Sequence, residues 1–189
     1  MNPPDVVRSE AEPLVETVEI KTHFKTPRGI ARAVDGVSIQ IRRGQSLGVV
    51  GESGSGKTVL SRSIMGLLPR NGVIREGSVR YQGQEIGNRT PKEMRSVWGR
   101  EMAMIFQDPM TSLNPVMKVG KQITESLRLH LGMSASEAMT IAEKLFRDVR
   151  IPEPTRRLNQ YPHELSGGMR QRVMIAIAMA CGPNMLFAD

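Results

Sequence analysis

One eight-residue segment combines glycines, a lysine and a threonine at a spacing suited to holding phosphate. It matches the pattern G-x-x-x-x-G-K-[ST] and consists of Gly51, Glu52, Ser53, Gly54, Ser55, Gly56, Lys57 and Thr58. Glycines let the backbone take positive φ angles and turn its N–H groups toward phosphate oxygens. The lysine can reach the β- and γ-phosphates, and the threonine hydroxyl can bind Mg²⁺. The pattern predicts a nucleotide-binding loop.

The flanking residues decide between this loop and its alternative, a glycine-rich turn with an incidental lysine. A short apolar run typical of a buried strand, residues 46–50, precedes the segment. A helical pattern of apolar residues follows over residues 57–68. The start of such a helix directs its positive end toward bound phosphate, so the context favours nucleotide binding.

The sequence LSGGMRQ at residues 165–171 is a second candidate anion site, at the predicted start of another helix. Ser166 can cap that helix, while Gly167 and Gly168 expose backbone N–H groups. One nucleotide does not need two helix N-termini from a single subunit. We therefore interpret the motif as a site for a nucleotide held by another copy, with an ordinary helix cap as the alternative on these residues alone.

Both motifs require a scaffold of strands and helices, which the apolar periodicity predicts. Strands are predicted over residues 14–24, 33–41, 46–50, 102–106 and 185–188, a hairpin over 76–86, and helices over 57–68, 90–100, 119–131, 134–149 and 167–180. Thr90 and Ser134 are the expected N-caps. A loop is expected over 107–115 and a connector over 152–162. The order of the elements predicts a parallel α/β core with insertions.

Composition excludes several other classes. The chain has 189 residues, 26 Lys+Arg and 19 Asp+Glu, a formal charge of +7, and one cysteine, so an intrachain disulfide scaffold is excluded. Residues 1–13 are polar, contain prolines, and are expected to form a disordered lead-in. No apolar stretch has the length of a membrane helix, so we expect a soluble or peripheral protein. Aromatic residues make up only 4%, which argues against a base-stacking platform.

Four motifs in this order resemble the ATP-binding subunit of ABC transporters: GESGSGKT, IFQDPMTSLNP, LSGGMRQRVMIAIAMA and MLFAD. The resemblance covers about residues 14–189 and is strongest to the dipeptide, oligopeptide and nickel importer branch. It implies a P-loop NTPase (RecA-like) parallel-sheet core, with an antiparallel β subdomain and a helical insertion. Residues 118–157 would form the helical subdomain, and the C-terminal part of the core would be missing.

The resemblance also implies roles for single residues. Phe24 stands where the family has an aromatic that stacks on adenine, with a buried strand aromatic as the alternative. Gln107 resembles the glutamine that touches Mg²⁺ and the attacking water, with a solvated loop residue as the alternative. Asp189 resembles the aspartate that holds Mg²⁺ through water, and with Lys57 and Gln107 it would form the catalytic set. A further resemblance is to the signature motif, which caps the ATP of the opposite subunit. The residues that match it are Ser166, Gly167, Gly168 and Gln171.

By this resemblance the chain is an ATPase that energises an importer for short peptides or a related solute. Two such subunits would sandwich ATP and Mg²⁺ between the glycine loop of one and the signature motif of the other. The implied partners are transmembrane permease subunits, a second ATP-binding subunit and, indirectly, a solute-binding protein, at the cytoplasmic face of the membrane. Nucleic acid is not expected. The alternative is a soluble ABC-type ATPase acting on nucleic acid or ribosomes, which the charge of +7 permits.

This sequence departs from the family pattern at its C-terminal end. The family places a glutamate that polarises the attacking water directly after the aspartate, whereas this sequence ends at Asp189. We therefore expect a fragment that binds Mg-ATP weakly, with ATPase activity at least about 100-fold below that of a full-length relative. A fragment that is not an enzyme and folds poorly is the remaining alternative.

Overall fold

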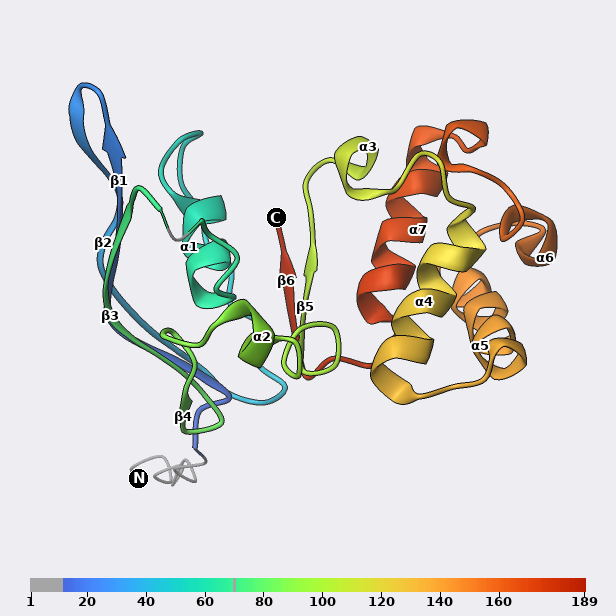
Figure 1. Cartoon of the computed structure of the whole chain (residues 1–189), viewed down its shortest axis with the longest axis horizontal. Coiled ribbons are helices and arrows are strands. Elements are labelled where there is room, and N and C mark those ends of the chain that lie inside the picture. Colours follow the sequence, from blue (N-terminus) through green and yellow to red (C-terminus); the bar gives the residue numbers. More distant parts are fainter. Residues whose placement is uncertain (1–11, 70) are drawn as a thin grey trace, which may run out of the picture. The chain divides into compact units, whose positions relative to one another are not determined.

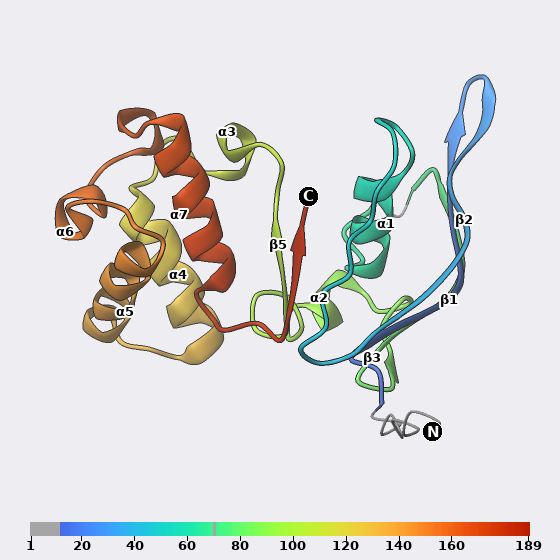
Figure 2. The same ribbon diagram turned by 180° about the vertical axis from the view of Figure 1, so that it is seen from behind.

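The computed structural model describes residues 12–69 and 71–189, and the chain divides into two compact units, Met1–Arg89 and Thr90–Asp189. The elements of each unit can be followed from two opposite sides (Figures 1 and 2). Residues 1–11, most of the expected lead-in, lie outside the described residues. Across the described part of the chain, no helix has the length and apolar character that crossing a membrane requires.

The first unit is built on an antiparallel sheet with the strand order β2-β1-β3-β4. Thr22 and Ser63 share a hydroxyl hydrogen bond of 2.8 Å, which ties helix α1 to this sheet. The predicted strands at 14–24 and 33–41 and the predicted hairpin are confirmed. The elements are β1 (Val15–Thr26), β2 (Gly29–Ile41), α1 (Lys57–Ile64), β3 (Val73–Tyr81) and β4 (Gln84–Glu85).

Helix α1 ends earlier than the predicted residue 68. Gly66 adopts a left-handed φ of 66°, and the N–H of Leu67 donates back to the carbonyl of Arg62 at 2.9 Å. Glycine takes this left-handed position at a helix end without strain. The stop signal is therefore Gly66, which lies three residues before Pro69.

The predicted buried strand at residues 46–50 is wrong. This segment is extended but forms no strand, and Leu47, Val49 and Val50 are 48%, 49% and 97% exposed. A buried strand needs hydrogen-bonded neighbours and a covered face. None of the strands among the described residues pairs with this segment, and the first unit does not bury its apolar side chains.

The second unit contains a parallel pair, β5 (Met102–Ile105) and β6 (Met185–Ala188), with Ile105 opposite Ala188. Both predicted strands are confirmed. Strand β5 is buried over its first three residues, whereas Phe187 is the buried residue of β6. Among the described strands, β6 pairs with β5 alone, so it is only partly covered and is not the buried strand expected.

Three long helices of the second unit match their predictions closely: α4 (Val119–Leu131), α5 (Ala135–Asp148) and α7 (Gly167–Met179). Ser134 begins α5 as predicted: its Oγ accepts from the N–H of Glu137 at 3.3 Å, and that carboxylate accepts from the N–H of Ser134 at 2.9 Å. Thr90 and Glu93 form the same reciprocal pair at the start of α2. A local S/T-x-x-E pattern thus fixes both helix starts.

Short helices account for the remaining differences from the prediction. Helix α2 (Pro91–Met94) is shorter than expected, because the N–H of Met102 bonds to the carbonyl of Val97 at 3.0 Å and the chain turns into β5. Helices α3 (Pro109–Ser112) and α6 (Pro154–Arg157) lie in the predicted loop and connector. Proline fits the first turn of a helix, so these two prolines begin helices instead of marking loops.

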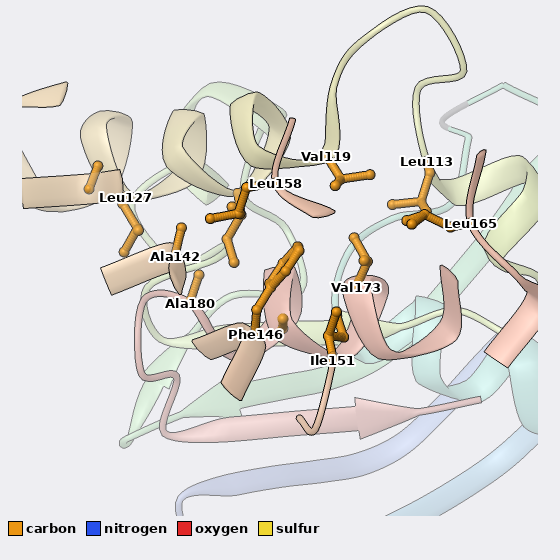
Figure 3. Close-up of a cluster of buried hydrophobic side chains, with 13 residues drawn as sticks. Leu113, Val119, Leu127, Ala142, Phe146, Ile151, Leu158, Leu165, Val173 and Ala180 are labelled. Carbon is orange, nitrogen blue, oxygen red and sulfur yellow. The ribbon is translucent and has the colours of Figure 1, made fainter. Parts of the chain in front are cut away.

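Helices α4, α5 and α7 enclose the apolar core of the second unit (Figure 3). Phe146 of α5, Ile123 of α4 and Val173 of α7 are fully buried there. The same cluster includes Leu113, which precedes α4, and Leu165, which precedes α7. The core therefore anchors both loops that carry candidate site residues in this unit.

Candidate nucleotide-binding site

The glycine loop of the first unit leaves its backbone open to a ligand. Gly54 and Gly56 take left-handed φ angles of 82° and 91°, which glycine adopts readily. Residues 51–55 are exposed, and α1 follows with Gly56 as its N-cap and no capping side chain. The first N–H groups of this helix have no side-chain cap as acceptor, which suits them to an anion.

The ammonium group of Lys57 is held over the same loop. Its Nζ donates to the carbonyl oxygens of Gly51 at 2.8 Å and Glu52 at 2.7 Å, and to Oγ of Ser55 at 3.3 Å. These bonds fix the position of a long, flexible side chain. Thr58, the next residue of the helix, is half-buried. The loop thus carries a positive charge at the place where the pattern predicts phosphates.

Phe24 belongs to the same unit. It lies in β1, opposite Ala31 of β2 and Val73 of β3, and its side chain is half-buried. The alternative, a buried strand aromatic, is therefore met only in part. Contact between its ring and adenine remains a prediction.

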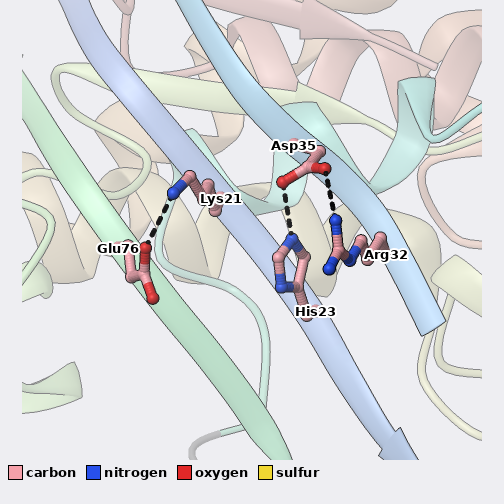
Figure 4. A network of polar contacts seen from close by, with 5 residues as sticks. All are labelled: Lys21, His23, Arg32, Asp35 and Glu76. Carbon is pink, nitrogen blue, oxygen red and sulfur yellow. Dashed lines mark hydrogen bonds and ion pairs between the residues drawn. The ribbon is translucent and has the colours of Figure 1, made fainter. Parts of the chain in front are cut away.

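A polar network lies on the face of β1 opposite to Thr22 (Figure 4). His23 Nε2 lies 3.0 Å from Oδ1 of Asp35, Arg32 Nη1 lies 3.5 Å from Oδ2 of the same carboxylate, and Lys21 Nζ lies 3.0 Å from Oε2 of Glu76. The hydrogen bond with His23 lowers the pKa of the Asp35 carboxyl. Successive strand residues face opposite sides of a sheet, so this network lies away from the side on which α1 meets Thr22.

Gln107 and Asp189 lie at one edge of the parallel pair in the second unit. Gln107 comes two residues after the end of β5, and Asp189 directly follows β6. The N–H of Asp189 donates to the carbonyl of Ile105 at 3.0 Å, so the two strand ends are in register. Both side chains are exposed. Carboxyl ends of adjacent parallel strands are a common place for ligand binding in α/β sheets.

The signature-like motif forms the start of α7. Ser166 caps the helix, because its Oγ accepts from the N–H of Met169 at 3.3 Å. Gly167, Gly168 and Gln171 are exposed, and nothing lies within 4 Å of the places where side chains of the two glycines would begin. The predicted helix start is confirmed, and its backbone is accessible to a partner.

Two side chains that bind the backbone of other segments were not identified from the sequence. Arg172 of α7 donates to the carbonyl oxygens of Val149 at 3.3 Å and Arg150 at 2.5 Å, where α5 ends. Gln122 of α4 binds the backbone of the segment that precedes its own helix. A polar residue on a helix usually faces solvent, so its place in the sequence gives no signal for either contact.

A family model described as ABC transporter matches residues 34–189. The chain is 47% identical over 181 residues to the probable peptide ABC transporter ATP-binding protein y4tR of Sinorhizobium fredii, covering 95% of this chain and 54% of that protein. It is 48% identical over 179 residues to the oligopeptide transport ATP-binding protein OppD of Salmonella typhimurium, covering 95% of this chain and 53% of that protein. The chain thus spans about half the length of the curated relatives it matches.

Among solved structures, the chain resembles a dimeric post-hydrolysis state of the ATP-binding cassette MJ0796 bound to ADP and Pi. The TM-score is 0.83 at 26% identity, and the match covers 93% of this chain and 73% of that chain. The predicted P-loop NTPase fold, with its antiparallel β subdomain and its parallel strands, is confirmed.

Proposed function

Because the chain belongs to the ABC transporter family, we propose that it binds and hydrolyses Mg-ATP and thereby energises an importer of short peptides. The observation that carries this proposal is the Lys57 ammonium, held over an exposed glycine loop at the start of α1. Such a loop binds phosphate through backbone N–H groups and the helix N-terminus. The peptide substrate is inferred from the names of the two curated relatives.

The donor groups of the chain fit a magnesium nucleotide. Hydroxyl and carboxylate oxygens suit Mg²⁺, and Thr58 and Asp189 supply one of each, with the Gln107 carboxamide as a further oxygen. Mg²⁺ would neutralise charge on the β- and γ-phosphates. Lys57 would add its positive charge, and the loop N–H groups would orient the phosphates. Phe24 would stack on the adenine ring.

The exposed start of α7 supports the use of two copies. Ser166, Gly167, Gly168 and Gln171 would bind the nucleotide that is held by the glycine loop of a second subunit. The similar cassette MJ0796 is dimeric. The further partners of this proposal are permease subunits at the cytoplasmic face of the membrane and, through them, a solute-binding protein.

Nucleotide titration of two lysine variants tests the proposal. Lys57→Ala removes the ammonium from the loop, and Mg-ATP affinity should fall at least about 100-fold, because charge-assisted hydrogen bonds to phosphate are lost. Lys92→Ala is the matched control, since Lys92 is exposed on α2, away from the glycine loop in sequence, and its loss removes the same charge. Calorimetric titration measures both.

Equal ATP affinities of the two variants would contradict the proposal. Binding of RNA or DNA that weakens steeply with salt would instead support the alternative of an ATPase acting on nucleic acid. Peptide uptake by vesicles that contain the permease subunits, with and without the Lys57→Ala variant, tests the transport role.

A further inference from the structure

The side chain of Gln122 fastens the end of the loop that carries Gln107. Its Oε1 accepts from the N–H of Asn114 at 3.0 Å, and its Nε2 donates to the carbonyls of Asn114 at 2.9 Å and Met117 at 2.8 Å. Asn114 in turn accepts from the N–H of Val116 at 3.1 Å. One carboxamide therefore uses both its donor group and its acceptor to tie this segment to the first turn of α4.

The same helical turn holds a second segment, which leads to Ser166. The N–H of Val119 donates to the carbonyl of Gln160, and the N–H of Gly120 donates to that of Leu158, both at 2.9 Å. Helix α4 has no capping side chain, so these carbonyls satisfy its first donors. A Cβ atom on Gly120 would lie 2.5 Å from the oxygen of Leu158, so the close approach depends on glycine.

Apolar packing joins the two segments as well. Leu113, at the end of the first segment, and Leu165, directly before Ser166, are each 4% exposed and belong to one buried cluster with Val119 (Figure 3). Helix α3 also packs against α7. Close-packed contacts of this kind transmit a displacement instead of absorbing it.

We propose that the first turn of α4 links the Gln107 loop to the Ser166 motif, and that Gln122 is the positioning residue that fastens this link. The proposal rests on the proposed function, in which Gln107 supplies an oxygen to Mg²⁺ in its own subunit and Ser166 binds the nucleotide of a second subunit. A shift of the loop at Asn114 would then move the segment at Leu158, because both are attached to one rigid helical turn.

Hydrogen exchange in two matched variants tests the link. Gln122→Met keeps the size of the side chain and removes all three hydrogen bonds, whereas Lys121→Met changes an exposed neighbour on the same turn. In Gln122→Met, the amide of Asn114 should exchange about tenfold faster, the factor that one lost hydrogen bond produces. The amides of Leu165 and Met169 should also exchange faster, while those of α5 should not. Acceleration confined to Asn114 and Val116, or equal in the Lys121→Met variant, would overturn the link.

A second variant changes the Leu158 side of the link and measures the effect at Asn114. Gly120→Ala places a Cβ atom against the carbonyl of Leu158 and should displace that segment. The link predicts faster exchange at the amide of Asn114, although none of its bonding partners has changed. Unchanged protection at Asn114 would contradict it. The exchange rates of α5 show whether either variant has lost stability as a whole.

A pH profile separates positioning from a merely structural role. In Gln122→Glu, a carboxylate would face the carbonyls of Asn114 and Met117, whereas the protonated form can donate one hydrogen bond. After correction for intrinsic rates, the protection of Leu165 and Met169 should recover below about pH 5 in this variant, since a glutamate protonates in that range. It should not recover in Gln122→Met. The same pH profile in both variants would overturn the role of Gln122.

Titration of the unaltered chain with Mg-ATP distinguishes a failure of the proposed function from a failure of the proposed link. If the unaltered chain does not bind ATP, the proposed function fails, whereas the exchange results still decide whether the link exists. If ATP binds and the link is present, ATP should slow exchange at Leu165 less in Gln122→Met than in the Lys121→Met control. An equal effect of ATP in both variants would contradict the functional use of the link.

Discussion

The carbonyl oxygen of Ala33 lies 2.1 Å from the point that a Cβ atom of Gly56 would occupy. Gly56 ends the glycine loop, and strand β2 therefore packs directly against the backbone of that loop. Its left-handed φ of 91° disfavours any residue with a side chain. Gly56→Ala should accordingly abolish Mg-ATP binding and lower the melting temperature, as measured by calorimetry of the variant.

The control for this variant is Gly48→Ala. Gly48 has no left-handed φ and nothing within 4 Å of its Cβ position, so this change should alter the free energy of unfolding by less than about 0.5 kcal/mol. If Gly56→Ala bound ATP as tightly as Gly48→Ala, the packing of β2 against the loop would not control its shape.

Phe24 provides a test of the base contact that does not depend on phosphate binding. Phe24→Ala should weaken ATP binding by roughly tenfold or more, the usual effect of losing one aromatic stacked on a base. Binding of inorganic tripolyphosphate, which has no base, should not change. Phe24→Tyr should restore ATP affinity. An equal loss for ATP and tripolyphosphate would show that Phe24 supports the loop instead of the adenine.

The capping box of α5 should make stability depend on pH. The hydrogen bond from the Ser134 hydroxyl lowers the pKa of Glu137 in the folded chain. A depressed folded pKa stabilises the protein above the unfolded pKa, and this contribution is lost as the pH falls through the folded pKa, between about pH 5 and 3. Ser134→Ala should cost about 1 kcal/mol at neutral pH and less at pH 3. Urea unfolding at both pH values measures the difference.

Glu137→Gln is the control for that pH dependence. Glutamine can also complete a capping box, but it does not titrate. The stability of this variant should therefore fall less between pH 5 and 3 than that of the unaltered chain. The same fall in both chains would mean that another carboxylate is responsible.

Substitution of Phe146 tests the core that anchors the Gln107 and Ser166 loops of the second unit. Its side chain is fully buried, and Phe146→Ala should cost about 3–5 kcal/mol through lost burial and the cavity that remains. Met139→Ala, a change at a residue of the same helix that is 44% exposed, should cost less than about 0.5 kcal/mol. Urea unfolding followed by helical circular dichroism compares them, and similar midpoints would contradict the assigned core.

Local signals predicted much of the fold. The bounds of α4 agree with the periodic pattern at both ends, and Ser134 caps α5 as its S-x-x-E pattern indicates. Residues of the glycine loop are consecutive, so their proximity needs no tertiary information. The pairing of β5 with β6 was also predictable as a class, since each follows or precedes a helical segment in an α/β order.

Features that depend on distant neighbours were not predictable. The apolar residues 46–50 have the composition of a buried strand, but composition does not say whether a partner strand covers them. Gln122 and Arg172 are polar residues of helices, and only the tertiary structure shows that they bind backbone carbonyls. Positioning residues are therefore harder to find than the motifs they support.

The exposed segment at residues 46–50 has a practical consequence for handling the protein. Val50 is 97% exposed beside two further apolar residues, in an extended backbone that no described strand pairs with. Unpaired extended segments recruit strands from other chains. Concentrated samples should therefore self-associate through this segment, and Val50→Lys should raise solubility by placing a charge within it.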